Sequence, residues 1–178
     1  MKSLLVFVCL CLPLAATAAR VSTEGFSIDV PEGWATQQGV MGVPLMARPN
    51  KARDAEGWGQ DLLTVTSEPA DRRRTCLDAF TQRKLTQLAY HASEFVKLEE
   101  EALDLPARLK GKGTAVATRL TLRYREGPRE LMAYVLVLDA GPRFLTATLT
   151  STPARFEFQR ARFRAAVESL RLTAAEPR

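Results

Sequence analysis

The sequence predicts an α/β (α+β) protein: a three-layer α/β/α sandwich with a central, mainly antiparallel sheet and two long helices. Short turns such as Glu126-Gly127-Pro128 separate alternating segments, which makes the flanking strands antiparallel neighbours. The segment 130–138 is apolar at both alternating sets of positions, so both faces of its strand need cover. Two amphipathic segments, near 75–92 and 153–170, are long enough to cover them.

Residues 1–19 have the features of a secretory signal peptide. Lys2 precedes an apolar run, and Ala-Thr-Ala-Ala at 16–19 predicts cleavage after Ala18 or Ala19. The run of about 11 residues is shorter than the roughly 20 that a membrane span needs, and no later segment is long and apolar enough. We therefore expect a periplasmic or secreted protein without a membrane span, an uncleaved anchor being the alternative. Residues 20–178 form one domain with a frayed tail from about 173.

Charge and cysteine content restrict the partner and the chemistry. The chain has 25 Lys and Arg and 20 Asp and Glu, and removal of Lys2 with the leader lowers the net charge from +5 to +4. This charge is too weak to indicate nucleic acid as a partner. Cys9 and Cys11 lie in the leader, so Cys76 is the one cysteine of the mature chain and no internal disulfide can form.

The first strand runs from about Gly25 to Val30 in the stretch FSIDVPEGW. Pro31 ends the strand because it lacks a backbone donor, and Gly33 allows the turn after it. Trp34 is expected to lie over the edge of the sheet. The following residues, 37–59, read as a loop that a short strand at 43–48 could interrupt, and 62–66 alternates as the next strand.

The first helix is expected to begin near Asp71 or Thr75 and to end at about Ala92. The segment Thr75-Cys-Leu-Asp78 resembles a capping box, with Asp in place of Glu. Four or five strands are then predicted, from the segments 95–103, 107–110, 115–125, 130–138 and 143–151. The last helix begins after Thr152 with Pro153 at a position where a missing amide costs nothing.

The opening stretch FSIDVPEGW and the closing stretch TPARFEFQRARFRAAVESLRL resemble those of PsbP-like and DcrB-type domains, over about residues 25–172. The resemblance implies a fold used for binding, found in accessory subunits of photosystem II, exported bacterial proteins and chaperones for hydrophobic segments. It carries over no catalytic residue, because none is shared across these proteins. The loop around Trp58 and the run Arg72 to Arg74 have no counterpart in it.

Cys76 is the residue with reactive potential, because a helix start and Arg72 to Arg74 would both favour its thiolate. His91, the single histidine, lies fifteen residues later on the same helix, over about 20 Å away, so the two cannot form a catalytic pair. We therefore expect a buried or half-buried structural cysteine. An intermolecular disulfide through Cys76 is the alternative.

Other patterns give no reason to expect an enzyme. His91 has no second histidine or cysteine pair to complete a metal site. Of Glu99-Glu100-Glu101, the first and third share a strand face, and a solvated sheet edge is expected there rather than a metal patch. Phosphate loops, nucleophile elbows and zinc-protease motifs do not occur. We expect no catalytic residue, no metal and no cofactor.

Met41, Met46 and Trp58 lie among glycines and polar residues in the predicted loop and could contact a partner. The alternative is that Met46 and Trp58 cap the sheet. The first functional hypothesis is an accessory protein that binds another envelope or secreted protein through a sheet face or this loop. The second is a carrier of a lipid or other apolar ligand held between helix and sheet, and the third is a redox-responsive protein acting through Cys76. The sequence does not determine the oligomeric state.

Overall fold

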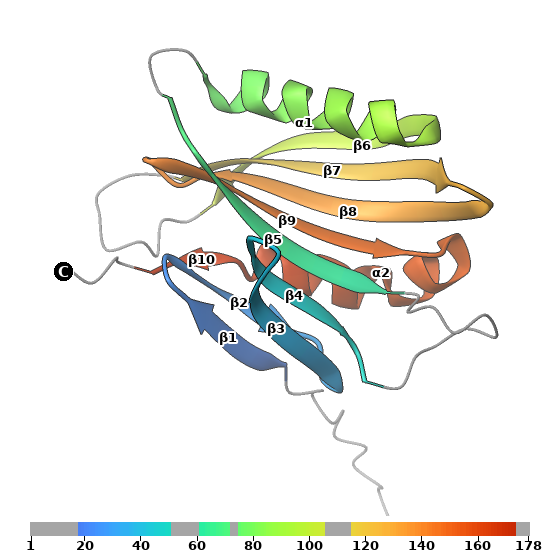
Figure 1. The fold of residues 1–178 in the computed structure, drawn as a ribbon, viewed down its shortest axis with the longest axis horizontal. Coiled ribbons are helices and arrows are strands. Elements are labelled where there is room, and N and C mark those ends of the chain that lie inside the picture. Colours follow the sequence, from blue (N-terminus) through green and yellow to red (C-terminus); the bar gives the residue numbers. More distant parts are fainter. Residues whose placement is uncertain (1–17, 51–60, 72–74, 106–114, 174–178) are drawn as a thin grey trace, which may run out of the picture.

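The computed structural model of the protein describes residues 18–50, 61–71, 75–105 and 115–173 (Figure 1). This part of the chain has the mixed α+β character that the sequence predicts. Its strands and helices are β1 (Ala19–Thr23), β2 (Phe26–Val30), β3 (Trp34–Val40), β4 (Val43–Pro49), β5 (Leu62–Pro69), α1 (Leu77–His91), β6 (Ser93–Leu105), β7 (Ala115–Glu126), β8 (Arg129–Asp139), β9 (Arg143–Ser151), α2 (Pro153–Glu168) and β10 (Arg171–Leu172).

Seven strands form the main sheet in the order β3-β4-β5-β9-β8-β7-β6. Every pairing in it is antiparallel. The short turns at Gly127 and Gly141 join β7 to β8 and β8 to β9, and both glycines have positive φ values of 59° and 84°. Only glycine adopts such values at little cost, so these residues make the tight reversals that the sequence predicts.

Strand β8 is buried on both faces, and each face meets a different helix. Met132, Tyr134, Leu136 and Leu138 belong to a core cluster that contains Phe156 and Phe163 of α2. Ala133, Val135 and Val137 belong to a second cluster that contains Leu77, Phe80 and Leu85 of α1. The two helices therefore lie on opposite sides of the main sheet, as Figure 1 shows. This arrangement explains why the sequence of β8 is apolar throughout.

The prediction of a single sheet is wrong, because the stretch FSIDV lies outside the main sheet. Strand β2 pairs with β1 on one side and with β10 on the other, forming a separate three-stranded sheet. Pro31 ends the ladder, and Gly33, with φ of 78°, redirects the chain into β3. Ser169, at the end of α2, accepts a hydrogen bond of 2.7 Å from the Asp29 amide. The small sheet is thus attached to α2.

The predicted loop after Trp34 is largely a β-hairpin. β3 and β4 pair antiparallel from Trp34↔Pro49 to Val40↔Val43, with Met41 and Gly42 at the turn. Trp34 itself packs edge-to-face on Phe163 of α2, with ring centroids 6.2 Å apart. The short strand that the sequence allowed at 43–48 is β4, whereas β3 was not predicted. Glutamines and glycine interrupt the apolar alternation of β3, which lies at the sheet edge, where neither face is deeply buried.

Helix α1 begins later than predicted, and the expected capping box is absent. Cys76 is the N-cap residue, and no side chain makes a capping hydrogen bond there. The Thr75 amide instead donates to the Asp71 carbonyl at 2.8 Å, in a turn before the helix. The predicted strand 107–110, the run Arg72 to Arg74 and most of the predicted leader lie outside the described residues. No helix in the described ranges is long and apolar enough to cross a membrane.

Candidate functional site

The strands at one end of the main sheet have a buried face and an open one. Leu45 of β4, Leu63 of β5 and Ala147 of β9 have no exposed surface and belong to the core cluster with α2. The alternate side chains of these strands point to the opposite face, where α1 lies. Helix α1 makes its main contacts with β6, β7 and β8. Among the described elements, none covers the rest of this face.

We call this uncovered region the open face. Its central row consists of side chains that the strand register places opposite one another, Gln37↔Met46, Met46↔Thr64 and Thr64↔Thr148. Gln37 is exposed, and the other three are half-buried. A sheet face made of threonine, methionine and glutamine combines apolar contact area with hydroxyl and amide hydrogen-bonding groups, which suits a binding surface.

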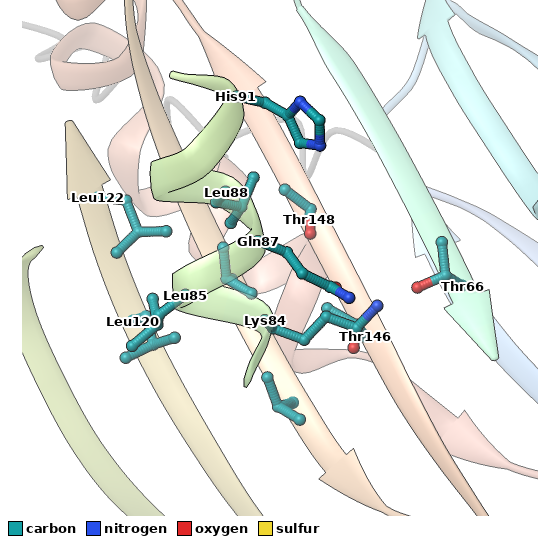
Figure 2. A pocket seen from close by; sticks show the side chains of 12 residues that line it. Thr66, Lys84, Leu85, Gln87, Leu88, His91, Leu120, Leu122, Thr146 and Thr148 are labelled. Carbon is teal, nitrogen blue, oxygen red and sulfur yellow. The ribbon is translucent and has the colours of Figure 1, made fainter. Parts of the chain in front are cut away.

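A cavity of about 370 Å³ lies where α1 meets the open face (Figure 2). This volume is within the range of roughly 300–1,000 Å³ that small-molecule pockets have. Apolar side chains of α1 and of strands β7 and β8 form most of its lining, and threonines of β5 and β9 complete it. The lining residues are Leu85, Leu88, Leu120, Leu122, Val135, Val137, Thr66, Thr146, Thr148, Lys84, Gln87 and His91.

Two polar groups of this cavity differ in their pairing. Lys84 of α1 forms an ion pair with Glu68 of β5, a carboxylate that it shares with Arg83. Thr146 of β9 is only 8% exposed, and its hydroxyl has no hydrogen-bond partner among the described residues. A buried hydroxyl without a partner is uncommon because it loses its hydrogen bonds to water on folding. Thr146 therefore has a buried, unpartnered hydroxyl in the wall of the cavity.

The structure separates the three predicted partner contacts. Met41 occupies the tip of the β3–β4 hairpin and is 96% exposed. Met46 lies in β4 on the open face, beside a smaller cavity of about 190 Å³ that Gln37, Arg48 and Leu62 also line. Trp58 lies outside the described residues. The cavity under α1 lies between helix and sheet, where the carrier hypothesis needs one. The sequence did not predict its set of lining residues, although the helical stripe with Leu85 and Leu88 belongs to it.

Cys76 does not have the buried position that we expected. It is exposed, because the apolar side of α1 begins one residue later, at Leu77. His91 is exposed at the other end of the helix and lines the cavity under α1. Within the ranges that the structure describes, no group of three or more His, Cys, Asp or Glu side chains is arranged to bind a metal ion.

Glu99 and Glu101 point to the same face of the edge strand β6, as predicted, and both are paired with arginines. Glu99 accepts a hydrogen bond of 2.7 Å from Arg160 of α2, and this bond is the main cause that lowers the pKa of the Glu99 carboxyl. Arg119 of β7 pairs with Glu101 and, at 2.7 Å, with Glu168 of α2. These ion pairs line a second cavity of about 600 Å³ and connect α2 to β6 and β7.

Tyr134, under these ion pairs, gives a prediction about alkaline stability. Burial raises the pKa of its phenol to about 12, from an ordinary value near 10. Because the folded protein holds the phenol proton more tightly than the unfolded chain, the contribution of Tyr134 to the free energy of unfolding is complete below pH 10. This contribution is lost as the pH rises towards 12. We expect the free energy of unfolding to fall more steeply over this range in the wild type than in Tyr134→Phe, measured by urea denaturation at pH 8, 10 and 11.

Tyr124 also has a raised pKa, again mainly through burial, so the Tyr134→Phe variant should keep part of the alkaline loss. Equal slopes in the two proteins would show that the buried phenol of Tyr134 does not titrate in this range.

The sequence matches no protein-family model and no curated protein. Solved structures do match. Cyanobacterial PsbP from Synechocystis superimposes with a TM-score of 0.64 at 18% identity, covering 93% of this chain and 99% of its own. The Ran-binding protein Mog1p of Saccharomyces cerevisiae gives 0.52 at 10% identity, covering 85% and 96%. LpqN of Mycobacterium tuberculosis, involved in cell envelope biogenesis, gives 0.50 at 12% identity, covering 90% and 88%. The predicted PsbP-like/DcrB-type fold is confirmed.

Proposed function

We propose that the protein is an exported, non-enzymatic accessory module that binds another protein through its open face and the tip of the β3–β4 hairpin. The observation that carries the proposal is Met41. Its backbone is in the left-handed region, with φ of 52°, and its side chain is 96% exposed. A long apolar side chain in this conformation does not benefit the fold.

The turn chemistry makes Met41 unusual. Met41 and Gly42 form a two-residue turn in which both φ values are positive, 52° and 77°, as a type I′ turn requires. Asn-Gly is the sequence that suits such a turn best, because asparagine tolerates the left-handed region. Methionine at this position lowers the local stability of the turn. Residues held in such unfavourable backbone conformations are concentrated at functional sites. A flexible, polarizable side chain is suited to contact with a protein surface.

The structural neighbours support a protein partner without identifying it. Mog1p is a Ran-binding protein, and it shares the fold of this chain at a level of identity that supports only the fold. LpqN is involved in cell envelope biogenesis, which is in keeping with an extracytoplasmic location. The three-layer α/β/α arrangement would act in this proposal as a rigid support for the open face.

Replacement of Met41 by asparagine is expected to stabilise the protein and to weaken partner binding. We expect the free energy of unfolding to rise by about 0.5–1 kcal/mol, because asparagine fits the turn. The stability is measured by urea denaturation. Binding is measured by affinity capture from the envelope fraction of the source cells, comparing the protein bands retained by the wild type and by Met41→Asn.

Phe158→Ser is the matched control. Phe158 is another exposed apolar side chain, 90% exposed, but it lies on α2, on the far side of the main sheet. The proposal requires a band that the wild type and Phe158→Ser retain and that Met41→Asn loses. If Phe158→Ser loses the band instead, the contact is on α2. If both variants retain it in full, Met41 has no part in binding.

Export is proposed from the leader features of residues 1–19. Ala19, the first residue of β1, pairs with Val30, next to the predicted cleavage sites after Ala18 and Ala19. Cleavage after Ala18 would leave this strand complete. The mature single domain would then begin at Ala19 instead of Arg20 and extend to residue 178. The mass of the secreted protein measures the cleavage point directly.

Two other functions have an observation in their favour. Exposure of Cys76 permits an intermolecular disulfide, so the capture experiment should be run with and without reductant. A dimer that disappears with reductant and in Cys76→Ser would support the redox function. The carrier function is supported by the cavity between α1 and the sheet, because its volume and apolar lining suit a small ligand.

A further inference from the structure

We propose that the cavity under α1 binds a small amphiphile, an apolar body with one terminal oxygen that accepts a hydrogen bond from the hydroxyl of Thr146. The proposal rests on the carrier function and specifies its ligand class. It is tested separately from the protein-binding proposal, whose test variant, Met41→Asn, lies at the hairpin tip. Neither the fold nor the structural neighbours assign a ligand to this cavity.

The lining requires that most of the ligand be apolar. Leu85 and Leu88 of α1 face Leu120, Leu122, Val135 and Val137 of the sheet across the cavity, as Figure 2 shows for the labelled leucines. Burial of apolar surface against these side chains is the main favourable contribution to binding. A volume of about 370 Å³ is at the small end of ligand cavities, which selects a short chain or a single ring rather than a two-chain lipid.

Thr146 supplies the polar end of the site. Its neighbours across the strands are Thr66 of β5 and Val137 of β8. Thr66 and Thr148, which also line the cavity, are half-buried, whereas Thr146 is only 8% exposed and has no partner within the described structure. The Thr146 oxygen is itself buried, so a rotation about χ1 would be needed to present the hydroxyl to an acceptor on a bound ligand, in surroundings where water does not compete.

The charge of the site does not decide between a neutral and an anionic acceptor. Lys84 lines the cavity, but it is already paired with Glu68, which also pairs with Arg83. An alcohol and a carboxylate share the acceptor oxygen that the site needs. Octanol and octanoate are therefore the probes. The ratio of their affinities measures how strongly the positive charge of Lys84 favours an anionic ligand over a neutral one.

The structure offers a matched pair of variants for the test. Thr81, on α1, is the other threonine with a buried hydroxyl that lacks a partner among the described residues, and it does not line the cavity. Valine replaces threonine with the same shape and no hydroxyl. Both Thr146→Val and Thr81→Val should raise the melting temperature by a few degrees, because each removes an unsatisfied buried group.

Ligand binding separates the two variants. Calorimetric titration of the full mature protein is expected to show that it binds octanol or octanoate, that Thr146→Val binds about tenfold more weakly, and that Thr81→Val binds within twofold of the wild type. Leu88→Trp, which fills the cavity from its half-buried side, should abolish binding while circular dichroism shows the folded spectrum.

Each contrary outcome has a distinct meaning. Unchanged affinity in Thr146→Val, or an equal loss in Thr81→Val, would overturn the role of Thr146 while leaving the carrier function in place. Unchanged affinity in Leu88→Trp would place the ligand elsewhere and overturn this proposal. If the wild type binds neither probe, the carrier function and this inference both fail, and the Met41→Asn experiment still tests protein binding by itself.

Discussion

Replacement of Phe163 by alanine is expected to lower the free energy of unfolding by about 3–5 kcal/mol. Phe163 has no exposed surface. Its ring lies 6.2 Å from Trp34 of β3 and 6.3 Å from Phe156 of the same helix, each in an edge-to-face arrangement. The cluster that contains it also holds Phe26 of the small sheet. Removal of the ring would leave a cavity where α2, the hairpin and the small sheet meet.

The measurement is urea denaturation of the wild type and Phe163→Ala, followed by circular dichroism. Phe158→Ala is the control on the same helix, since Phe158 is 90% exposed and should change stability by less than about 0.5 kcal/mol. A similar small change in both variants would mean that α2 does not close the core as described.

Replacement of Arg155 by methionine is expected to lower the free energy of unfolding by about 3 kcal/mol. Asp61, immediately before β5, is 1% exposed and accepts hydrogen bonds from both ends of the Arg155 guanidinium and from the Ser151 hydroxyl. Removal of the arginine leaves a buried carboxylate without a counter-charge, which is strongly destabilising. Arg155 is about one-third exposed on its side chain, so the effect should be at the low end of the usual 3–5 kcal/mol.

Arg160→Met is the control for this experiment. Arg160 lies on the same helix as Arg155 and pairs with Glu99 of β6, but 45% and 53% of the two side chains are exposed, so the loss should stay below about 1 kcal/mol. Arg155→Met should also be less harmful in an Asp61→Asn background, where no buried charge remains. Equal losses in both backgrounds would show that the charge of Asp61 is not the cause.

Local sequence patterns predicted the elements that tertiary packing reinforces. The doubly apolar stretch that became β8 needed cover on both faces, and it has α1 on one and α2 on the other. Thr152 and Pro153 predicted the start of α2 at its observed position. In each case the preference of the segment agrees with its environment in the fold, and such agreement makes a segment predictable.

Elements that depend on distant partners were predicted less well. The alternation in β2 correctly indicated a strand, but the pairing of β2 with β1 and β10 depends on the end of α2, through the bond between Ser169 and Asp29. The hairpin strand β3 has little apolar alternation because its residues from Ala35 onward are exposed. Cys76 was expected to be buried, but whether a residue at a helix start is buried depends on the rotation of the helix against the sheet.

In the candidate site, too, local sequence features could be predicted and features that depend on long-range packing could not. Met41 and Met46 were predicted as possible partner contacts from the sequence, and this stays a prediction, while the position of Met41 at a turn with positive φ became evident only from the fold. The cavity under α1 is formed by side chains of five separate elements, α1, β5, β7, β8 and β9. The spacing of residues along one helix or strand does not predict a cavity that forms between several elements.

By itself, the sequence determined the α+β character of the protein, the antiparallel order of β7, β8 and β9, and the start of α2. These depend on hydrophobic period, turn residues and helix caps, all of which act over a few neighbouring residues. Only the tertiary structure decided that the strands divide between two sheets, that α1 leaves part of a face uncovered by the described elements, and that Thr146 lacks a partner among the described residues. These depend on how elements far apart in the chain pack together, which local spacing does not encode.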